Sequence, residues 1–192
     1  TGSAKVFRVG GVVGENSGTI TGTTASGTVT ATNYVGAGVA TATGTQYVGG
    51  LAGYISGTGT ITSSSTSSNV YAVMKNTHTS TSTFYAGGMA GLNVSTAASS
   101  LADVSTTGSV SMDFAGGYSS GRSSGYIGGL LGGLGSATSS SIIRATSSGT
   151  VQSTFYGTNS PQYLGGLVGY MNSTGSISDS SSSSPVTYNQ TA

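Results

Sequence analysis

A short glycine-centred segment recurs five times along the chain, and its spacing restricts the folds that are possible. The copy at residues 47–53 reads YVGGLAG, and the paired glycines of the five copies begin at positions 10, 49, 87, 128 and 165. Successive copies are therefore 39, 38, 41 and 37 residues apart. A period near this length that extends through a whole chain is typical of repeat proteins, in which each repeat packs mainly on its neighbours.

A second spacing, inside each repeat, does not vary at all. An aliphatic residue is followed nine residues later by a valine in all five copies, and Ser and Thr dominate its surroundings. One inward-facing residue between polar neighbours is the pattern of a short strand, and the fixed step predicts a rigid corner between two such strands. We expect two core ladders, formed by Ile20, Ile61, Leu101, Ile142 and Ile177 and by Val29, Val70, Val110, Val151 and Val186.

These segments predict an all-β fold, a β-solenoid (parallel β-helix) of about five rungs with three short strands per rung. Helices are not expected, because Gly, Ser and Thr are poor helix formers and no window has a period of 3.6 residues. One rung buries too little apolar surface to fold alone, whereas strands stacked about 4.8 Å apart form a continuous core. We expect a single repeat domain over residues 1–192, with repeats at about 5–42, 43–80, 81–121, 122–158 and 159–192.

Between each valine and the next glycine pair lie longer linkers, which we interpret as loops, some with an extra strand, that leave one face of the solenoid. These linkers contain Met74, His78, Phe84, Met112, Phe114, Phe155 and Pro161.

The glycine segment is apolar on both of its alternating faces, which predicts a strand that is buried on both sides. Either the linkers or another copy of the chain would cover its outer face. The candidate contact residues are those of the repeated motif, namely Arg8, Tyr47, Tyr85, Tyr126, Tyr163, Leu51, Met89, Leu130 and Leu167.

Tyrosine opens four of the five copies, at Tyr47, Tyr85, Tyr126 and Tyr163, and Arg8 opens the first. In a stack these rings would lie one above another, and Arg8 would cap them through a cation–π contact. Ordinary half-buried strand residues would also explain the column. A carbohydrate-binding aromatic strip is an alternative that no other residue supports.

The repeats resemble the GLUG repeat family. The segment at residues 163–170 reads YLGGLVGY, and it is followed by NSTGSIS at 172–178 and by a serine run up to Val186. The second and fifth copies are the closest to the family pattern, and the first is divergent, with Val12 in place of Leu and Arg8 in place of Tyr. Similar repeats occur in bacterial surface and secreted proteins, namely adhesins and certain surface peptidases, where the repeat itself carries no known catalysis. The resemblance implies an extracellular β-solenoid and no particular ligand.

Few residues of the chain could take part in catalysis or in metal binding. Charged residues make up 5% of the chain and the net charge is +1, so no nucleic-acid partner is expected. The chain has no run of about 18 apolar residues, so membrane insertion is not expected either. With no cysteine and one histidine, His78, we expect no metal, no cofactor and no enzyme activity. Among the acidic residues only Asp103 and Asp179 occupy matching repeat positions, which we interpret as chance. Asn-X-Ser/Thr patterns make Asn93, Asn172 and Asn189 candidate glycosylation sites.

We expect the chain to be a structural subunit of an extracellular filament, sheath or surface layer, secreted with its leader removed. The expected partner is the chain itself, through end-to-end stacking and lateral contacts, because the terminal rungs of a solenoid expose unpaired strand edges. A stalk or ligand-binding segment of a secreted or cell-surface adhesin is the alternative. An ice-binding solenoid is a remote one, based on the Thr-X-Thr patterns at 19–21, 28–30 and 60–62.

Overall fold

The structure, a computed structural model, describes residues 5–35, 44–76, 82–115, 123–135, 140–156, 161–172 and 174–191. Within these residues all regular structure is β-strand, and every strand pairing is parallel. The predicted class, an all-β parallel solenoid, is therefore confirmed. The strands form four sheets, which we name A to D in the order in which the chain visits them.

Sheets A and B take up the glycine segment. Sheet A contains β1 (Lys5–Gly10), β6 (Gly44–Gly49), β11 (Ser82–Gly87), β15 (Ser124–Gly128) and β19 (Gln162–Gly165). Sheet B contains β2 (Val13–Asn16), β7 (Ala52–Ile55), β12 (Ala90–Asn93), β16 (Leu131–Leu134) and β20 (Val168–Met171).

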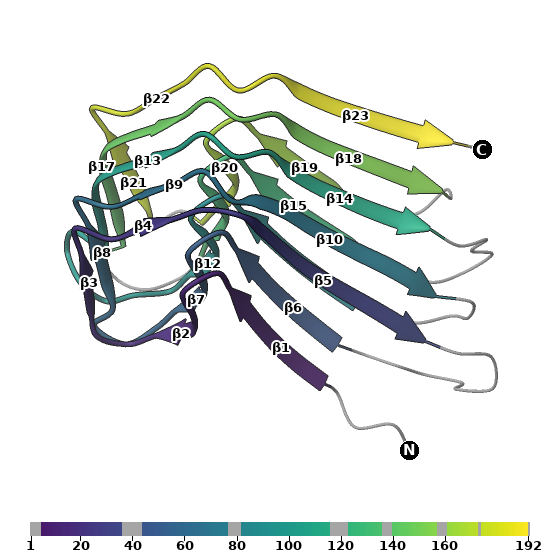
Figure 1. Ribbon diagram of the computed structural model, residues 1–192, viewed down its shortest axis with the longest axis horizontal. Coiled ribbons are helices and arrows are strands. Elements are labelled where there is room, and N and C mark those ends of the chain that lie inside the picture. Colours follow the sequence, from purple (N-terminus) through teal and green to yellow (C-terminus); the bar gives the residue numbers. More distant parts are fainter. Residues whose placement is uncertain are drawn as a thin grey trace.

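Sheets C and D carry the two ladders. Sheet C contains β3 (Thr19–Thr21), β4 (Thr24–Ala25), β8 (Thr60–Thr62), β9 (Ser65–Thr66), β13 (Leu101–Thr106), β17 (Ser141–Ser147), β21 (Ser176–Ser178) and β22 (Ser181–Ser182). Sheet D contains β5 (Thr28–Val35), β10 (Asn69–Asn76), β14 (Val110–Ala115), β18 (Val151–Tyr156) and β23 (Val186–Thr191). Figure 1 shows the stack from β1 at the bottom to β23 at the top, with the long strands of sheet D on the right.

Every repeat contributes to all four sheets, so the prediction of three strands per rung is wrong. The error lies in the glycine segment, which is two strands rather than one. In the second repeat β6 ends at Gly49, the chain bends at residues 50–51, and β7 begins at Ala52 in another sheet. The apolar pattern on both faces therefore reflects a corner whose two arms belong to different sheets.

Each glycine of the motif is required by a different close contact at this corner. A Cβ atom added to Gly87 would lie 2.1 Å from the carbonyl oxygen of Ala90, three residues later. One added to Gly88 would lie 2.3 Å from the carbonyl oxygen of Gly129 in the next repeat, and one on Gly91 would lie 2.5 Å from the backbone nitrogen of Val48 in the preceding repeat. All three neighbours are backbone atoms, so only glycine fits.

The corner divides the core into two lobes. The A–D lobe contains Val29, Ala31, Val48, Val70, Ala72, Met74, Phe84, Ala86, Val110, Met112, Phe114, Ile127, Val151 and Phe155. The B–C lobe contains Leu51, Ala52, Ile55, Ile61, Met89, Ala90, Leu101, Val104, Leu130, Leu131, Leu134, Ile142 and Ala145. Between the lobes, buried hydroxyls face the second glycine of the corner: the Thr106 Oγ1 donates a hydrogen bond of 2.7 Å to the Gly129 carbonyl. The interior is therefore two apolar columns that flank a polar one.

The described residues of the linkers lie mostly on strands of sheets A and D and contribute to the core, so the interpretation of the linkers as loops with an occasional extra strand is corrected for these residues. Met74, Phe84, Met112, Phe114 and Phe155 are all buried on strands of sheets A and D. The Phe114 ring meets the rings of Phe84 and Phe155 edge-on, with centroids 5.6 Å apart in both pairs. Pro161 is exposed just before β19, and His78 lies outside the described residues. The phenylalanines thus extend the A–D lobe beyond the valine ladder.

The invariant nine-residue step coincides with a left-handed residue in sheet C. Two positions after each ladder aliphatic, the backbone has a φ between 49° and 60° in every repeat, at Gly22, Ser63, Asp103, Arg144 and Asp179. Side chains other than glycine adopt this conformation infrequently. An insertion here would displace the left-handed residue from the column, which accounts for the constant spacing.

Candidate assembly surfaces

The structure pairs the two predicted ladders residue by residue. Ile61 pairs with Ile20 and Leu101, and Ile142 with Leu101 and Ile177; the valines from Val29 to Val186 pair in the same way. In the middle repeats these side chains are fully buried, whereas Ile177 and Val186 in the last repeat are 39% and 46% exposed. The ladders therefore run into an open face at the C-terminal end of the stack.

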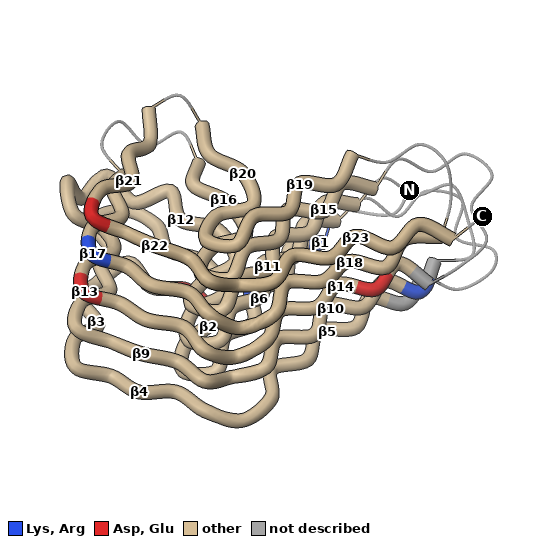
Figure 2. The backbone as a smooth tube through the Cα atoms, turned by 90° about the horizontal axis from the view of Figure 1, so that it is seen from above, with Lys and Arg blue, Asp and Glu red and all other residues tan. Residues whose placement is uncertain are grey.

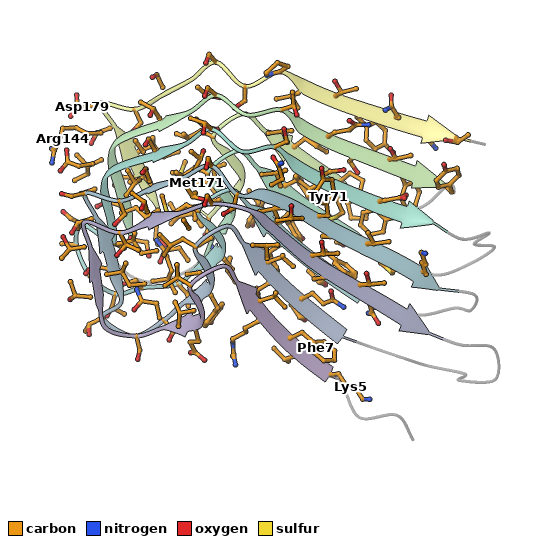
Figure 3. The ribbon with its side chains drawn as sticks, in the orientation of Figure 1. Lys5, Phe7, Tyr71, Arg144, Met171 and Asp179 are labelled. Atoms are coloured by element: carbon orange, nitrogen blue, oxygen red, sulfur yellow. The ribbon has the colours of Figure 1, made fainter. Side chains whose placement is uncertain are left out.

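This last end face, formed by β19 to β23, exposes several further large side chains. Tyr163, Tyr170, Met171 and Tyr188 are all exposed, and Met171 is labelled in Figure 3. β19, β20, β21 and β23 are each the terminal strand of their sheet, and β22 pairs only with β17. One backbone edge of each of these strands therefore has no partner in the described part of the chain. The face therefore offers both apolar surface and unpaired peptide groups.

The first end face, formed by β1 to β5, has the same character. Phe7 occupies the same column as the buried Gln46 and Phe84, yet it is 47% exposed because β1 is the terminal strand of sheet A among the described residues. Figure 3 shows Phe7 on the lowest strand, β1. Val9, Val13 and Ile20 lie in the first repeat at the starts of columns that are buried further along. Both ends of the stack thus present the cross-section of its core.

The leucine positions predicted as contacts for a neighbouring copy lie inside the chain. Leu51, Met89 and Leu130 are fully buried and pack in the B–C lobe, and Leu167 is partly buried against it. They stand at the corner, where the side chain after the second glycine turns inward. Neither linkers nor a second copy are needed to cover them, so this expectation is wrong for the three buried positions.

The four motif tyrosines form a stacked column along sheet A. The centroids of successive rings are 5.4, 4.6 and 5.0 Å apart from Tyr47 through Tyr85 and Tyr126 to Tyr163, and the rings tilt by 19° or less relative to their neighbours. Within the column each ring face is covered by the next ring, and only the two terminal faces, those of Tyr47 toward the first repeat and of Tyr163 toward the last end face, lack a ring of the column. Sugars stack on the faces of aromatic rings, so this column presents little of the surface that a carbohydrate strip needs.

Burial within the column changes the acidity of the phenols. Burial, and then the neighbouring Tyr126 and Tyr47, raise the pKa of Tyr85 to about 12. Burial also raises the pKa of Tyr47 and Tyr126. The phenols of Tyr47, Tyr85 and Tyr126 are therefore un-ionised at neutral pH.

Arg8 takes the tyrosine position in the first repeat but does not cap Tyr47. Its register partner is Tyr47, whereas its guanidinium lies over the ring of Tyr54, with Cζ 4.8 Å from the ring centroid. A salt bridge of 3.3 Å from Nη1 to the Glu15 carboxylate accompanies this contact. Glu15 is in turn the register partner of Tyr54. Tyr54 does not stand out in the sequence because its column holds Leu92 and Gly133 in the next two repeats, and tyrosine returns there only at Tyr170.

A short row of charges follows the left-handed corner of sheet C. The Nε and Nη2 atoms of Arg144 donate to the two carboxylate oxygens of Asp103, at 2.6 and 2.7 Å. This pairing holds the pKa of Asp103 below its usual range, and Asp179 contributes to raising that of Arg144. Figure 2 shows the row as red, blue and red at the edge of the molecule beside β13 and β17. Asp103 and Asp179 therefore match because both occupy the corner column.

The three candidate glycosylation sites have different surroundings. Asn93 is fully buried; its Nδ2 donates to the Ser100 Oγ at 2.7 Å, and its Oδ1 accepts from the Ser95 backbone at 2.9 Å. Asn172 is half-buried, and Asn189 is exposed on β23. Asn93 is thus a structural side chain that is inaccessible in the folded chain.

The threonine rows are short. Thr60 donates to Thr19 at 3.4 Å and Thr62 to Thr21 at 3.1 Å. In the third repeat the corresponding residues are Ser100, which is buried, and Ala102. An ordered hydroxyl array therefore spans two repeats only.

The described residues contain no cluster of three or more His, Asp or Glu side chains suited to a metal ion. In the same part of the chain there is no helix long and apolar enough to span a membrane.

The comparison with known families matches residues 6–30 to the GLUG motif. The resemblance to GLUG-repeat proteins is thereby confirmed, although the matching copy is the first rather than the second or fifth. The matched residues include strands from all four sheets, from β1 into β5. Comparisons with curated proteins and with solved structures gave no significant match.

Proposed function

Since the chain carries the GLUG motif, we propose that it is a structural subunit of an extracellular filament, sheath or surface layer that assembles by end-to-end stacking of its solenoid. Its five repeats act as about five rungs, and the last rung of one copy pairs with the first rung of the next. Lateral contacts between such stacks complete the assembly.

One observation carries this proposal: apolar columns that are fully buried in the middle of the stack open at its ends. Val70, Val110 and Val151 have no exposed surface, whereas Val186 in the same column is 46% exposed. Burial of apolar surface contributes roughly 25 cal/mol per Å², so an apolar end face favours a covering partner.

The occupant is a second copy because the two end faces continue the same register. If β19 of one copy stacked against β1 of the next, Leu164 would lie beside Val9. If β23 stacked against β5, Val186 would lie beside Val29, in the same register as adjacent repeats within the chain. The unpaired edges of the parallel sheets would then hydrogen-bond to each other. A head-to-tail contact of this kind does not close on itself, so it propagates into a filament.

Low charge favours the same assembly. The net charge of +1 provides little long-range repulsion between copies, and the side of the stack is rich in serine and threonine hydroxyls. The extracellular location rests on the resemblance to surface and secreted proteins; surface labelling of intact source cells would test it.

A pair of lysine variants tests the proposal. Val186→Lys places a charge on the last end face, at a side chain that is already half exposed, and Gln152→Lys places the same charge on the outer side of the neighbouring strand β18. We expect filaments in negative-stain micrographs of the native chain and of Gln152→Lys, and dispersed monomers for Val186→Lys.

Two results would contradict the proposal. One is a native chain that stays monomeric at every concentration in sedimentation experiments, which is the behaviour expected of an adhesin stalk. The other is a Val186→Lys variant that forms filaments as readily as the native chain.

A further inference from the structure

We propose that Arg8 of one copy closes the tyrosine column of the preceding copy, so that the junction is directional and held in a single register. This inference rests on the proposed function and names the contact that specifies it. The tyrosine column ends at Tyr163, whose inner face stacks on Tyr126 at 5.0 Å with the rings only 5° from parallel. Its outer face belongs to the last end face, where Tyr163 is 42% exposed.

Tyr170 stands beside this open ring. Its ring centroid is 5.7 Å from that of Tyr163 and 5.4 Å from that of Tyr126, and both contacts are nearly edge-on. The last end face therefore carries an aromatic corner with one ring face directed along the stack.

The first end face carries a guanidinium in the matching column. Arg8 is the register partner of Tyr47, so continued stacking would place it next to Tyr163 of the preceding copy. Glu15 heads the column that ends in Tyr170. The Arg8 side chain remains 39% exposed although it already contacts Glu15 and the ring of Tyr54.

A junction in this register would place the guanidinium between two aromatic rings, Tyr54 of its own chain and Tyr163 of the neighbour. A planar cation interacts favourably with a ring face, and more strongly when water is excluded. Glu15 would balance the charge at the same place. Arginine suits this position better than lysine because its guanidinium is flat and less strongly hydrated.

The alternative arrangements lack this match. In a contact between two first faces or two last faces, a two-fold axis would make the facing strands antiparallel and break the columns. Two first faces would also bring two copies of the same cationic side chain, Arg8, into one interface. Only the head-to-tail contact offers a cation to an open aromatic face.

The test uses two chains that can form one junction only. Phe7→Lys blocks the first end face and leaves the last one intact, whereas Val186→Lys blocks the last and leaves the first intact. We expect each variant to be monomeric alone and the mixture to form a 1:1 dimer in sedimentation equilibrium. Circular dichroism checks that each is folded, and Ile177→Lys replaces Val186→Lys if that variant is not.

Arg8→Ala is then added to one partner at a time. In the Val186→Lys chain, Arg8 lies at the junction, and its loss should weaken the dimer about tenfold. In the Phe7→Lys chain, the same substitution lies on the blocked face and should leave the dissociation constant unchanged. Arg8→Lys at the junction should give an intermediate value.

The outcomes separate the two claims. A dimer that forms with the same affinity whichever partner carries Arg8→Ala would overturn the role of Arg8 and leave end-to-end assembly standing. Failure of the folded variants to form any dimer would overturn both. Dimers of one variant alone would show a symmetric contact and contradict the direction proposed.

Discussion

Gly87 offers the most direct test of the reasoning about the glycine corner. A Cβ atom at this position would lie 2.1 Å from the Ala90 carbonyl oxygen, 2.6 Å from that of Leu130 and 2.8 Å from the backbone nitrogen of Gly132. Ordinary van der Waals contact begins near 3.4 Å, so the first of these atoms would have to move by roughly 1.3 Å. All three are buried backbone atoms, Ala90 and Gly132 on strands and Leu130 in the bend between β15 and β16, so no side-chain rotation can relieve the clash.

Overpacking of a core usually costs about 1–3 kcal/mol, and a clash with backbone belongs at or above the upper end of that range. We therefore expect Gly87→Ala to lower the free energy of unfolding by about 3 kcal/mol or more. For a chain of this size, the melting temperature would fall by roughly 6–12 °C. Urea unfolding followed by circular dichroism measures the effect.

Gly18→Ala is the matched control. Gly18 is exposed, has no heavy atom within 4 Å of a built Cβ, and does not require a left-handed backbone. Alanine there should be neutral or should stabilise the chain by up to about 1 kcal/mol, because it restricts the unfolded state. Equal stability of Gly87→Ala and Gly18→Ala would refute the steric explanation of the motif.

Three further predictions concern single side chains. Arg144 lowers the pKa of Asp103, so the stability that Asp103 contributes is present above the ordinary pKa near 3.8 and is lost as the pH falls through the pKa of the folded state. The unfolding midpoints of Asp103→Asn and of the native chain should therefore differ at pH 7 and converge in acid. The pKa of Tyr85 is raised to about 12, so the stability linked to its un-ionised phenol is present below pH 10 and is lost between about pH 10 and 12. Tyr85→Phe should therefore lose less stability than the native chain over that interval, and part of the tyrosinate absorbance of the native chain should appear only above pH 10. Thr106→Val removes a buried hydrogen bond of 2.7 Å and should cost about 1 kcal/mol, whereas Thr107→Val, on the exposed side, should be neutral in the same thermal unfolding experiment.

The sequence was sufficient for the features that depend on contacts between equivalent positions. The step from Ile20 to Val29 recurs without change, and in a parallel stack identical spacing means identical register. Both ladders and the parallel solenoid follow from that single regularity. The tyrosine column follows in the same way, since stacked parallel strands bring equivalent residues about 4.8 Å apart.

Features that depend on contacts between different positions were not accessible. The corner at Gly49 looks like one strand in the sequence, because the carbonyl oxygen of Ala52 and the Cα atom of Ala90 that exclude a side chain there are found only in three dimensions. Met74 and Phe84 looked like linker residues because their columns change identity from repeat to repeat.

The charged residues at the left-handed corner of sheet C could also be predicted only in part from the sequence. Asp103 and Asp179 matched in the sequence, but arginine occupies the intervening position, Arg144, and a search for identical residues finds no column there. Tyr54 was missed for a similar reason, because its contact with Arg8 joins two different columns.

The axial repeat of the assembled protein is the most direct test of end-to-end stacking. Sheets A, B and D each contain five strands, so a head-to-tail stack in continuous register adds five strand spacings of about 4.8 Å per subunit. Electron cryomicroscopy or fibre diffraction of filaments should therefore give an axial rise of about 24 Å per subunit, with the strands perpendicular to the axis. Filaments with a different rise, with strands along the axis, or a protein that never assembles would contradict the account.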